Sequence, residues 1–229
     1  MKRISIIFVI CATILLIWTR TKAEYGGIPL KHSPLKTQLI LQSTHALENI
    51  ILLPESPFDQ EEAKDMISRL DHIPPNLLEA ADRQEIKIRF FQQQLTDFST
   101  TSHLKGVTPR GYTNENITWD NVPGIGGSKL VLVKIGHSEK GNGHGSCNLE
   151  LHELAHSIDR YVLADLTYTL EFLPIWKKEA PLLFPAQPYF HQYEAEYFAE
   201  AFAMFYLNGE TRNLLKKKAP ATYRFFTNL

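Results

Sequence analysis

The stretch that decides the fold is Leu149-Glu150-Leu151-His152-Glu153-Leu154-Ala155-His156-Ser157-Ile158. Its apolar residues recur at helical spacing, which predicts a helix over residues 147–162 with one apolar side. His152 and His156 are four residues apart, so both imidazoles project from the same side of this helix and can reach one zinc ion. Glu153 then lies beside the ion, where it can take a proton from bound water. The pattern predicts a metal-dependent hydrolase.

A third metal ligand is expected from a second predicted helix, over residues 190–208. Glu196 and Glu200 are four residues apart on one face of this helix, near aromatic residues such as Phe198 and Phe202. Carboxylates on an aromatic-rich face cost free energy unless a cation or a hydrogen-bond donor meets them. From the residues alone, a ligand pair and a solvated pair of glutamates both remain open.

The rest of the sequence predicts an α+β domain in which helices dominate the second half. Apolar periodicity predicts further helices over residues 35–53, 60–70, 77–83, 164–178 and 210–226, the last interrupted by Pro220. Alternating or continuous apolar residues predict two strands, over 86–90 and 130–135. Two loop regions rich in glycine, residues 97–129 and 136–145, separate these elements, and either Ser146 or Asn148 can cap the histidine-containing helix.

The N-terminus has the layout of a secretory signal. Residues 1–23 begin with basic residues, continue with an apolar run and end on the small residue Ala23. The apolar run is shorter than the roughly 20 residues that a membrane span needs. We therefore expect export with cleavage after Ala23, leaving residues 24–229 as the domain. An uncleaved membrane anchor stays open as the alternative, because basic residues precede the cleavage site at Arg20 and Lys22.

Composition excludes some classes of partner. The chain has 24 basic and 25 acidic residues, so its formal net charge of −1 gives no long-range attraction to phosphate backbones or anionic lipid. Nucleic acid is not an expected partner. With 44% hydrophobic and 21% charged residues, the chain has the composition of a globular domain. Cys147 stands alone after removal of the signal, so no internal disulfide forms, and we interpret this cysteine as a packing residue rather than a nucleophile.

Several segments resemble a known family of metallopeptidases. The segment 143–159, followed by Glu194-Ala195-Glu196-Tyr197-Phe198-Ala199-Glu200-Ala201-Phe202, resembles the catalytic domain of anthrax lethal factor. It resembles more closely the small secreted Pro-Pro endopeptidases of Gram-positive bacteria. Residues 110–112 and 118–127 are similar to the substrate loop of those endopeptidases, and residues 216–226 are similar to the family's C-terminal helix.

The resemblance implies a mostly helical, zincin-type metallopeptidase domain with a small sheet whose edge strand lines the cleft. It divides the domain into an N-terminal helical part, residues 24–84, and a catalytic part, residues 85–229. It implies one zinc ion per chain, with the ligands His152, His156 and Glu196 and the general base Glu153.

Other roles also follow from the resemblance alone. Glu200 would be an outer-shell acid that orients a ligand histidine, and Tyr189 would stabilise the oxyanion. Leu130–Ile135 would be the edge strand that pairs with an extended substrate. Substrate-binding residues would be Arg110, Tyr112 and Trp119.

Three residues depart from the pattern of the Pro-Pro endopeptidases. Tyr112 replaces a tryptophan, Arg110 replaces a lysine, and Ala195 replaces a glutamate just before the third ligand. The expected function is that of a secreted zinc endopeptidase from a Gram-positive bacterium, which hydrolyses protein or peptide substrates by a metal-activated water. We expect a preference for proline near the scissile bond, with looser tolerance than in those relatives. The alternative is a non-catalytic protein-binding module.

Overall fold

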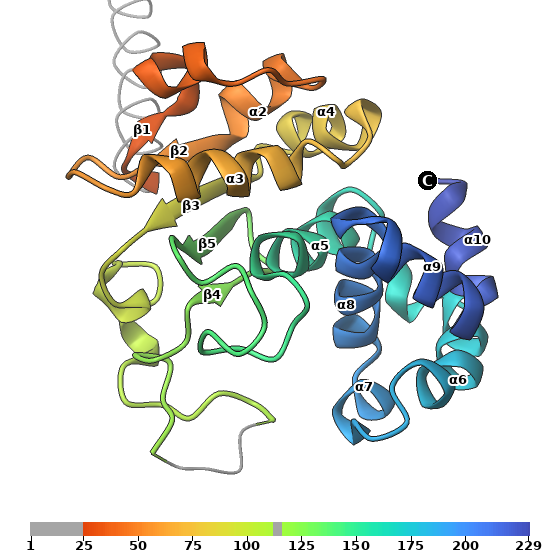
Figure 1. Cartoon of the computed structure of the whole chain (residues 1–229). Coiled ribbons are helices and arrows are strands. Elements are labelled where there is room, and N and C mark those ends of the chain that lie inside the picture. The colour runs from red at the N-terminus through yellow and green to blue at the C-terminus, as the bar shows by residue number, and fades with distance from the viewer. Residues whose placement is uncertain (1–24, 112–115) are drawn as a thin grey trace, which may run out of the picture.

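A mixed sheet of five strands lies among the helices of the described part of the chain, residues 25–111 and 116–229, in the computed structural model (Figure 1). The strands are β1 (Ile28–Pro29), β2 (Ile51–Leu53), β3 (Lys87–Phe91), β4 (Gly124–Ile125) and β5 (Leu130–Lys134). They lie in the order β1-β2-β3-β5-β4, with β2, β3 and β5 parallel and the two short strands antiparallel at the edges. The predicted signal and Tyr112 lie outside the described residues.

The two predicted strands are confirmed and form the centre of the sheet. In β3, Ile88 and Phe90 are buried, whereas Lys87 and Arg89 between them are half-buried. In β5 the run of leucine and valine is buried on both faces, as expected for a parallel strand that is covered on both sides. β3 and β5 pair along their full length.

The N-terminal helices follow the prediction only in part. They are α2 (Thr44–Ile50), α3 (Gln60–Leu70) and α4 (Pro75–Arg83), and the last two confirm the predicted helices. The prediction of one helix over 35–53 is wrong, because its first part is a short 3-10 helix and Ile51–Leu53 is β2. A short apolar run fits a helix and a buried strand equally well, and here pairing with β3 decides between them.

The histidine-containing helix, α5 (Leu149–Tyr161), lies between the sheet and the C-terminal helices (Figure 1). It packs against β5 on one side and against α8 (Glu194–Leu207) on the other. Of the two predicted caps, Asn148 is the N-cap, because its side chain accepts a hydrogen bond from the backbone N–H of Leu151 at 3.0 Å. Ser146 in turn bonds to the backbone of Asn148.

The remaining helices are α6 (Phe172–Leu183), α7 (Pro188–Gln192), α9 (Gly209–Lys218) and α10 (Pro220–Thr227). The helix predicted over 164–178 begins only at Phe172, because Ala164 and Asp165 adopt left-handed backbone conformations. The helix predicted over 190–208 is divided into α7 and α8 by Tyr193, whose backbone is extended. The predicted break near Pro220 is confirmed, and this proline begins α10, where the missing N–H costs nothing.

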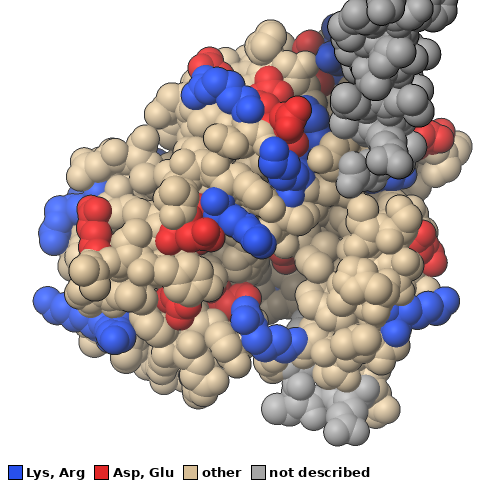
Figure 2. Space-filling model, turned by 180° about the vertical axis from the view of Figure 1, so that it is seen from behind, with Lys and Arg blue, Asp and Glu red and all other residues tan. Residues whose placement is uncertain are grey.

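Short 3-10 helices connect these elements: η1 (Leu30–His32), η2 (Pro34–Gln38), η3 (Leu95–Asp97), η4 (Ser102–Leu104) and η5 (Leu166–Tyr168). One main hydrophobic core joins the sheet, the N-terminal helices and the C-terminal helices, so the predicted α+β class is confirmed. On the face shown in Figure 2, basic and acidic side chains are interspersed rather than separated by sign. Within the described residues, no helix combines the length and the apolar character needed to cross a membrane.

Candidate metal centre and cleft

Helices α5 and α8 bring three candidate metal ligands together. The Nε2 atoms of His152 and His156 lie 3.3 Å apart on the same side of α5. From α8, Glu196 directs its Oε2 to within 3.5 Å of the first imidazole and 3.8 Å of the second. These ligand atoms all lie within 4.8 Å of one another. Two imidazoles and a carboxylate converging on one point form a donor set that fits zinc.

Glu200 lies one turn further along α8 and contacts the first imidazole from behind. Its Oε2 is 3.2 Å from Nδ1 of His152, and its Oε1 accepts a hydrogen bond from the backbone N–H of Cys147 at 2.9 Å. Because a carboxylate only accepts, Nδ1 carries the proton and Nε2 is left free to act as a ligand. Burial raises the pKa of the Cys147 thiol, so this cysteine is not activated as a nucleophile.

Charges at the cluster favour a cation. Burial alone would lower the pKa of His152, but hydrogen bonds with Glu196 and Glu200 outweigh it and raise the pKa to about 10. Burial would raise the pKa of Glu196, but the hydrogen bond from His152 and the nearby imidazoles lower it to about 2. Burial and the charge of His152 lower the pKa of His156 to about 4. The carboxylates therefore stabilise positive charge at this point, whether on an imidazole or on a bound cation.

Glu153 faces the cleft beside the cluster. Burial raises the pKa of its carboxyl to about 7, partly offset by the neighbouring imidazole. A carboxyl group with a pKa near neutral can both accept and return a proton, as general acid–base catalysis requires.

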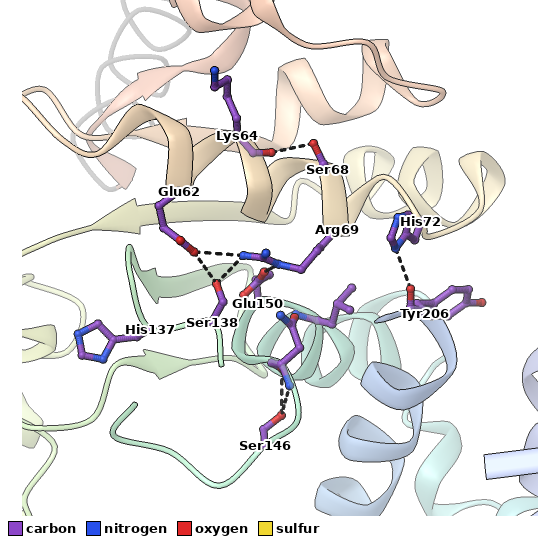
Figure 3. Close-up of polar contacts among 12 residues, drawn as sticks. Glu62, Lys64, Ser68, Arg69, His72, His137, Ser138, Ser146, Glu150 and Tyr206 are labelled. Carbon is purple, nitrogen blue, oxygen red and sulfur yellow. Dashed lines mark hydrogen bonds and ion pairs between the residues drawn. The ribbon is translucent and has the colours of Figure 1, made fainter. Parts of the chain in front are cut away.

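Helix α5 is held from its opposite side by a buried ion pair. Figure 3 shows Arg69 reaching from α3 to Glu150, which is completely buried in the first turn of α5. The Nε atom of Arg69 lies 2.6 Å from Oε1 of Glu150, and Nη2 donates to Ser138 at 2.8 Å. Glu62 completes the network. The start of α5 and the glycine-rich loop before it are therefore fixed to the N-terminal helical part.

A cavity of about 640 Å³ opens beside the cluster and is lined by several of the residues expected to bind substrate. Arg110, Trp119 and Tyr189 line it together with the candidate ligands. The hydroxyl of Tyr189 lies near Arg110 and Glu196, and burial, together with the charge of Glu196, raises its pKa. A second cavity, of about 500 Å³, continues past Glu153 toward Asp165 and Tyr168. Together these cavities form one cleft across the cluster.

The edge strand of the cleft differs from the prediction. Leu130–Ile135 is not at the edge, because β5 is paired on one side with β3 and on the other with β4. The strand that lines the cleft is β4, Gly124–Ile125, which lies directly on α5. A Cβ atom on Gly126 would lie 1.9 Å from the carbonyl oxygen of Glu153. The glycines at 124, 126 and 127 were the signal in the sequence that could have revealed this close approach.

Comparison with known proteins identifies the family. A family model described as "Anthrax toxin lethal factor, N- and C-terminal domain" matches residues 39–229. The chain belongs to this family. Its relatives include the Pro-Pro endopeptidase of Paenibacillus alvei, which is 40% identical over 188 residues, covering 82% of this chain and 86% of that protein. The Pro-Pro endopeptidase of Clostridioides difficile is 42% identical over 190 residues, covering 83% and 86%. The resemblance inferred from the motifs is confirmed.

A solved structure supports the same conclusion for the fold of this lethal factor-like domain. The structure of the Pro-Pro endopeptidase from Paenibacillus alvei superposes with a TM-score of 0.76 at 40% identity, over 80% of this chain and 98% of that one. The match therefore extends well beyond the two helices that carry the candidate ligands.

In this lethal factor-like domain, the side chain of Asp120 joins the two ends of the loop that carries Arg110, near residues 106 and 118. Its carboxylate accepts hydrogen bonds from the hydroxyl of Thr96, from the backbone N–H of Gly106 at 2.7 Å and from Thr118 at 2.9 Å. These bonds, with the one from Thr96 foremost, lower the pKa of Asp120 to about 2. The two ends of the loop, near Gly106 and Thr118, are therefore joined through one side chain.

Sequence reasoning missed one residue beside the cluster. The guanidinium carbon of Arg110 lies 4.2 Å from the centre of the Tyr193 ring, a cation–π contact. The sequence predicted that Tyr193 lies inside a helix, and no turn residue marks the break there. The contact joins two segments that are far apart in the sequence, so no local pattern could have revealed it.

Proposed function

We propose that the chain is an exported, zinc-dependent endopeptidase that cleaves next to proline. The observation that carries this proposal is the convergence of His152, His156 and Glu196 in a cleft that also receives Glu153. Catalytic zinc sites use three protein ligands of these types and leave a further position open. Membership of the lethal factor family, and relatives named Pro-Pro endopeptidase, support a proline-containing peptide as substrate.

Each of these residues of the cleft has its own role in the proposed reaction. When bound, a zinc ion would supply Lewis acidity toward a peptide carbonyl and lower the pKa of a water molecule. Glu153 takes a proton from the attacking water and returns it to the leaving amine as the C–N bond breaks. The hydroxyl of Tyr189 donates a hydrogen bond to the oxygen that becomes negatively charged. Glu200 keeps His152 in the tautomer that presents Nε2 to the metal.

The substrate would lie along β4. This strand is last in the sheet order of the described residues, so an extended peptide can add to it by backbone hydrogen bonds. Trp119 and Tyr189 offer aromatic faces that suit the ring of proline. Proline also has its φ angle already fixed, so binding it costs less conformational entropy.

Two variants separate the base from the metal ligand. In Glu153→Gln the three ligands are intact, so zinc should stay at one ion per chain while the cleavage rate falls by about 10² to 10⁴. Glu196→Ala should instead lose zinc, measured by elemental analysis after gel filtration. A wild-type chain that binds peptide but contains no zinc and cleaves nothing would support the alternative, a protein-binding module.

Specificity and export are tested separately. Cleavage of a peptide library with proline varied at each position should show a preference for proline near the scissile bond, and indifference to proline would contradict the specificity alone. Expression in a Gram-positive host should yield extracellular protein that begins at Glu24. An intact N-terminus in the membrane fraction would instead support the uncleaved anchor.

A further inference from the structure

The contacts of Arg110 connect the loop over the cleft to the candidate metal ligand. Its Nη2 atom donates to Oε1 of Glu196 at 3.0 Å, and its guanidinium also lies near the hydroxyl of Tyr189, with which it lines the cleft. Arg110 stands on the loop whose two ends are joined by Asp120. One guanidinium therefore reaches from this loop to two groups that the proposed chemistry uses.

The contact with Arg110 fixes the orientation of the Glu196 carboxylate. Its Oε2 faces His152 and His156, whereas its Oε1 is occupied by Arg110. A hydrogen bond to the second oxygen fixes the rotation of the carboxylate, so that one oxygen remains directed at the metal position. Partners of this kind orient metal ligands and tune metal affinity.

The side chain of Arg110 needs support of its own, because 57% of it is exposed. Position 195, in the first turn of α8, holds an alanine and offers no carboxylate to the guanidinium. The ring of Tyr193 contacts the guanidinium instead, with the guanidinium carbon 4.2 Å from its centre. The same ring packs against Tyr189 at 5.0 Å between ring centres. Tyr193 also has the extended backbone that separates α7 from α8, which presents its side chain to the loop.

We propose that Tyr193 is a positioning residue that acts through Arg110. By stacking on the guanidinium it keeps Arg110 bonded to Glu196. This inference rests on the proposed function, since it assigns Tyr193 a part in orienting the candidate ligand Glu196 of that same site.

A double-mutant cycle tests the proposal with two measurements: kcat/KM on a proline-containing peptide, and the rate of zinc loss to a chelator from the loaded protein. Tyr193→Leu should lower kcat/KM and speed zinc loss, each by about 3- to 10-fold, the size of a partly desolvated cation–π contact. Tyr193→Phe keeps the ring face and should stay within about 2-fold of wild type. In an Arg110→Met background, Tyr193→Leu should have almost no further effect, because the group it acts through is gone.

Tyr223→Leu is the matched control. Tyr223 has a lysine, Lys216, 5.4 Å from its ring centre in the helices α9 and α10, away from the cleft. This variant should change neither measurement, although it removes a similar pair. Thermal unfolding of all variants checks that differences in folding do not account for the result.

The outcomes separate this inference from the function on which it rests. If wild type shows zinc-dependent cleavage but Tyr193→Leu and Arg110→Met are additive in either measurement, or Tyr193→Phe is as impaired as Tyr193→Leu, Tyr193 does not act through Arg110. If wild type neither retains zinc nor cleaves peptide, the proposed function fails and this inference fails with it.

Discussion

Arg69→Met tests how α5, the helix that carries two candidate metal ligands, is held in place. Glu150 is completely buried, its Oε1 accepts the 2.6 Å bond from Arg69, and its Oε2 has no hydrogen-bond partner among the described residues. Methionine keeps much of the apolar stem of arginine but removes the guanidinium. The carboxylate of Glu150 would then remain buried without a counter-charge.

The magnitude follows from the burial of the two partners. Removing one partner of a buried ion pair costs about 3–5 kcal/mol. Because 24% of the Arg69 side chain is exposed, water reaches this side of the pair, and we expect the lower end, about 3 kcal/mol. That is a large part of the roughly 5–15 kcal/mol by which domains are stable. For a chain of this size it lowers the melting temperature by about 6–12 °C.

Thermal and urea unfolding, followed by circular dichroism, measure the effect. Arg83→Met is the matched control, because Arg83 and Glu79 form an ion pair at 3.8 Å whose side chains are 68% and 58% exposed. Its loss should cost less than about 0.5 kcal/mol. The double variant Arg69→Met with Glu150→Leu removes both charges and should regain most of the lost stability.

Two results would refute this reasoning. One is a loss of stability below about 1 kcal/mol in Arg69→Met, which would mean that water or another group satisfies the carboxylate. The other is a double variant less stable than Arg69→Met, which would mean that the pair contributes through its shape rather than through its charges.

Three further predictions concern the cleft and the loop beside it. Tyr189→Phe removes only a hydroxyl, so kcat should fall by roughly 10² with KM little changed in steady-state kinetics. Gly126→Ala puts a Cβ against the backbone of Glu153 and should abolish most activity at a cost of about 1–3 kcal/mol in unfolding free energy, whereas Gly209→Ala, which meets nothing within 4 Å, should not. The pKa of Asp120 is lowered from 3.8 to about 2, so its carboxylate stabilises the fold above pH 3.8 and this contribution is lost as the pH falls toward 2. Asp120→Asn should therefore melt below wild type near neutral pH, and the difference should shrink over that acid range.

The sequence predicts best what depends on local spacing. His152 and His156 are neighbours on α5 because residues four apart always share a helix side. Glu196 lies on another helix, and its place in the cluster depends on how α5 and α8 pack. From the residues alone the glutamate pair stayed ambiguous, and it took the resemblance to the lethal factor family to choose between ligand and solvated pair.

Elements made by pairing were predicted less well. β4 has two residues, too few to show any periodicity, so its position beside β5 could not be read from alternation. Once β4 occupies that side, β5 cannot be the edge, and the prediction for Leu130–Ile135 fails for this reason. The same holds for Ile51–Leu53, where pairing with β3 converts an apolar run from helix to strand.

Local spacing along α5 places the candidate catalytic residues, whereas contacts between distant segments shape the loop beside the cleft. Helix α5 is fixed on three sides, by Arg69 at its first turn, by the close approach of Gly126 just after β4 and by Glu200 from α8. A helix held in this way keeps the two imidazoles and Glu153 in the same place whichever substrate is bound. The loop that carries Arg110 is joined at its ends by Asp120 and contacts the cluster through the bond of Arg110 to Glu196. We therefore expect substitutions of Arg110 to affect the candidate third ligand as well as recognition. A short motif on one helix therefore predicts the reaction, whereas the contact of Arg110 with Tyr193 joins distant segments and is made only in the folded chain.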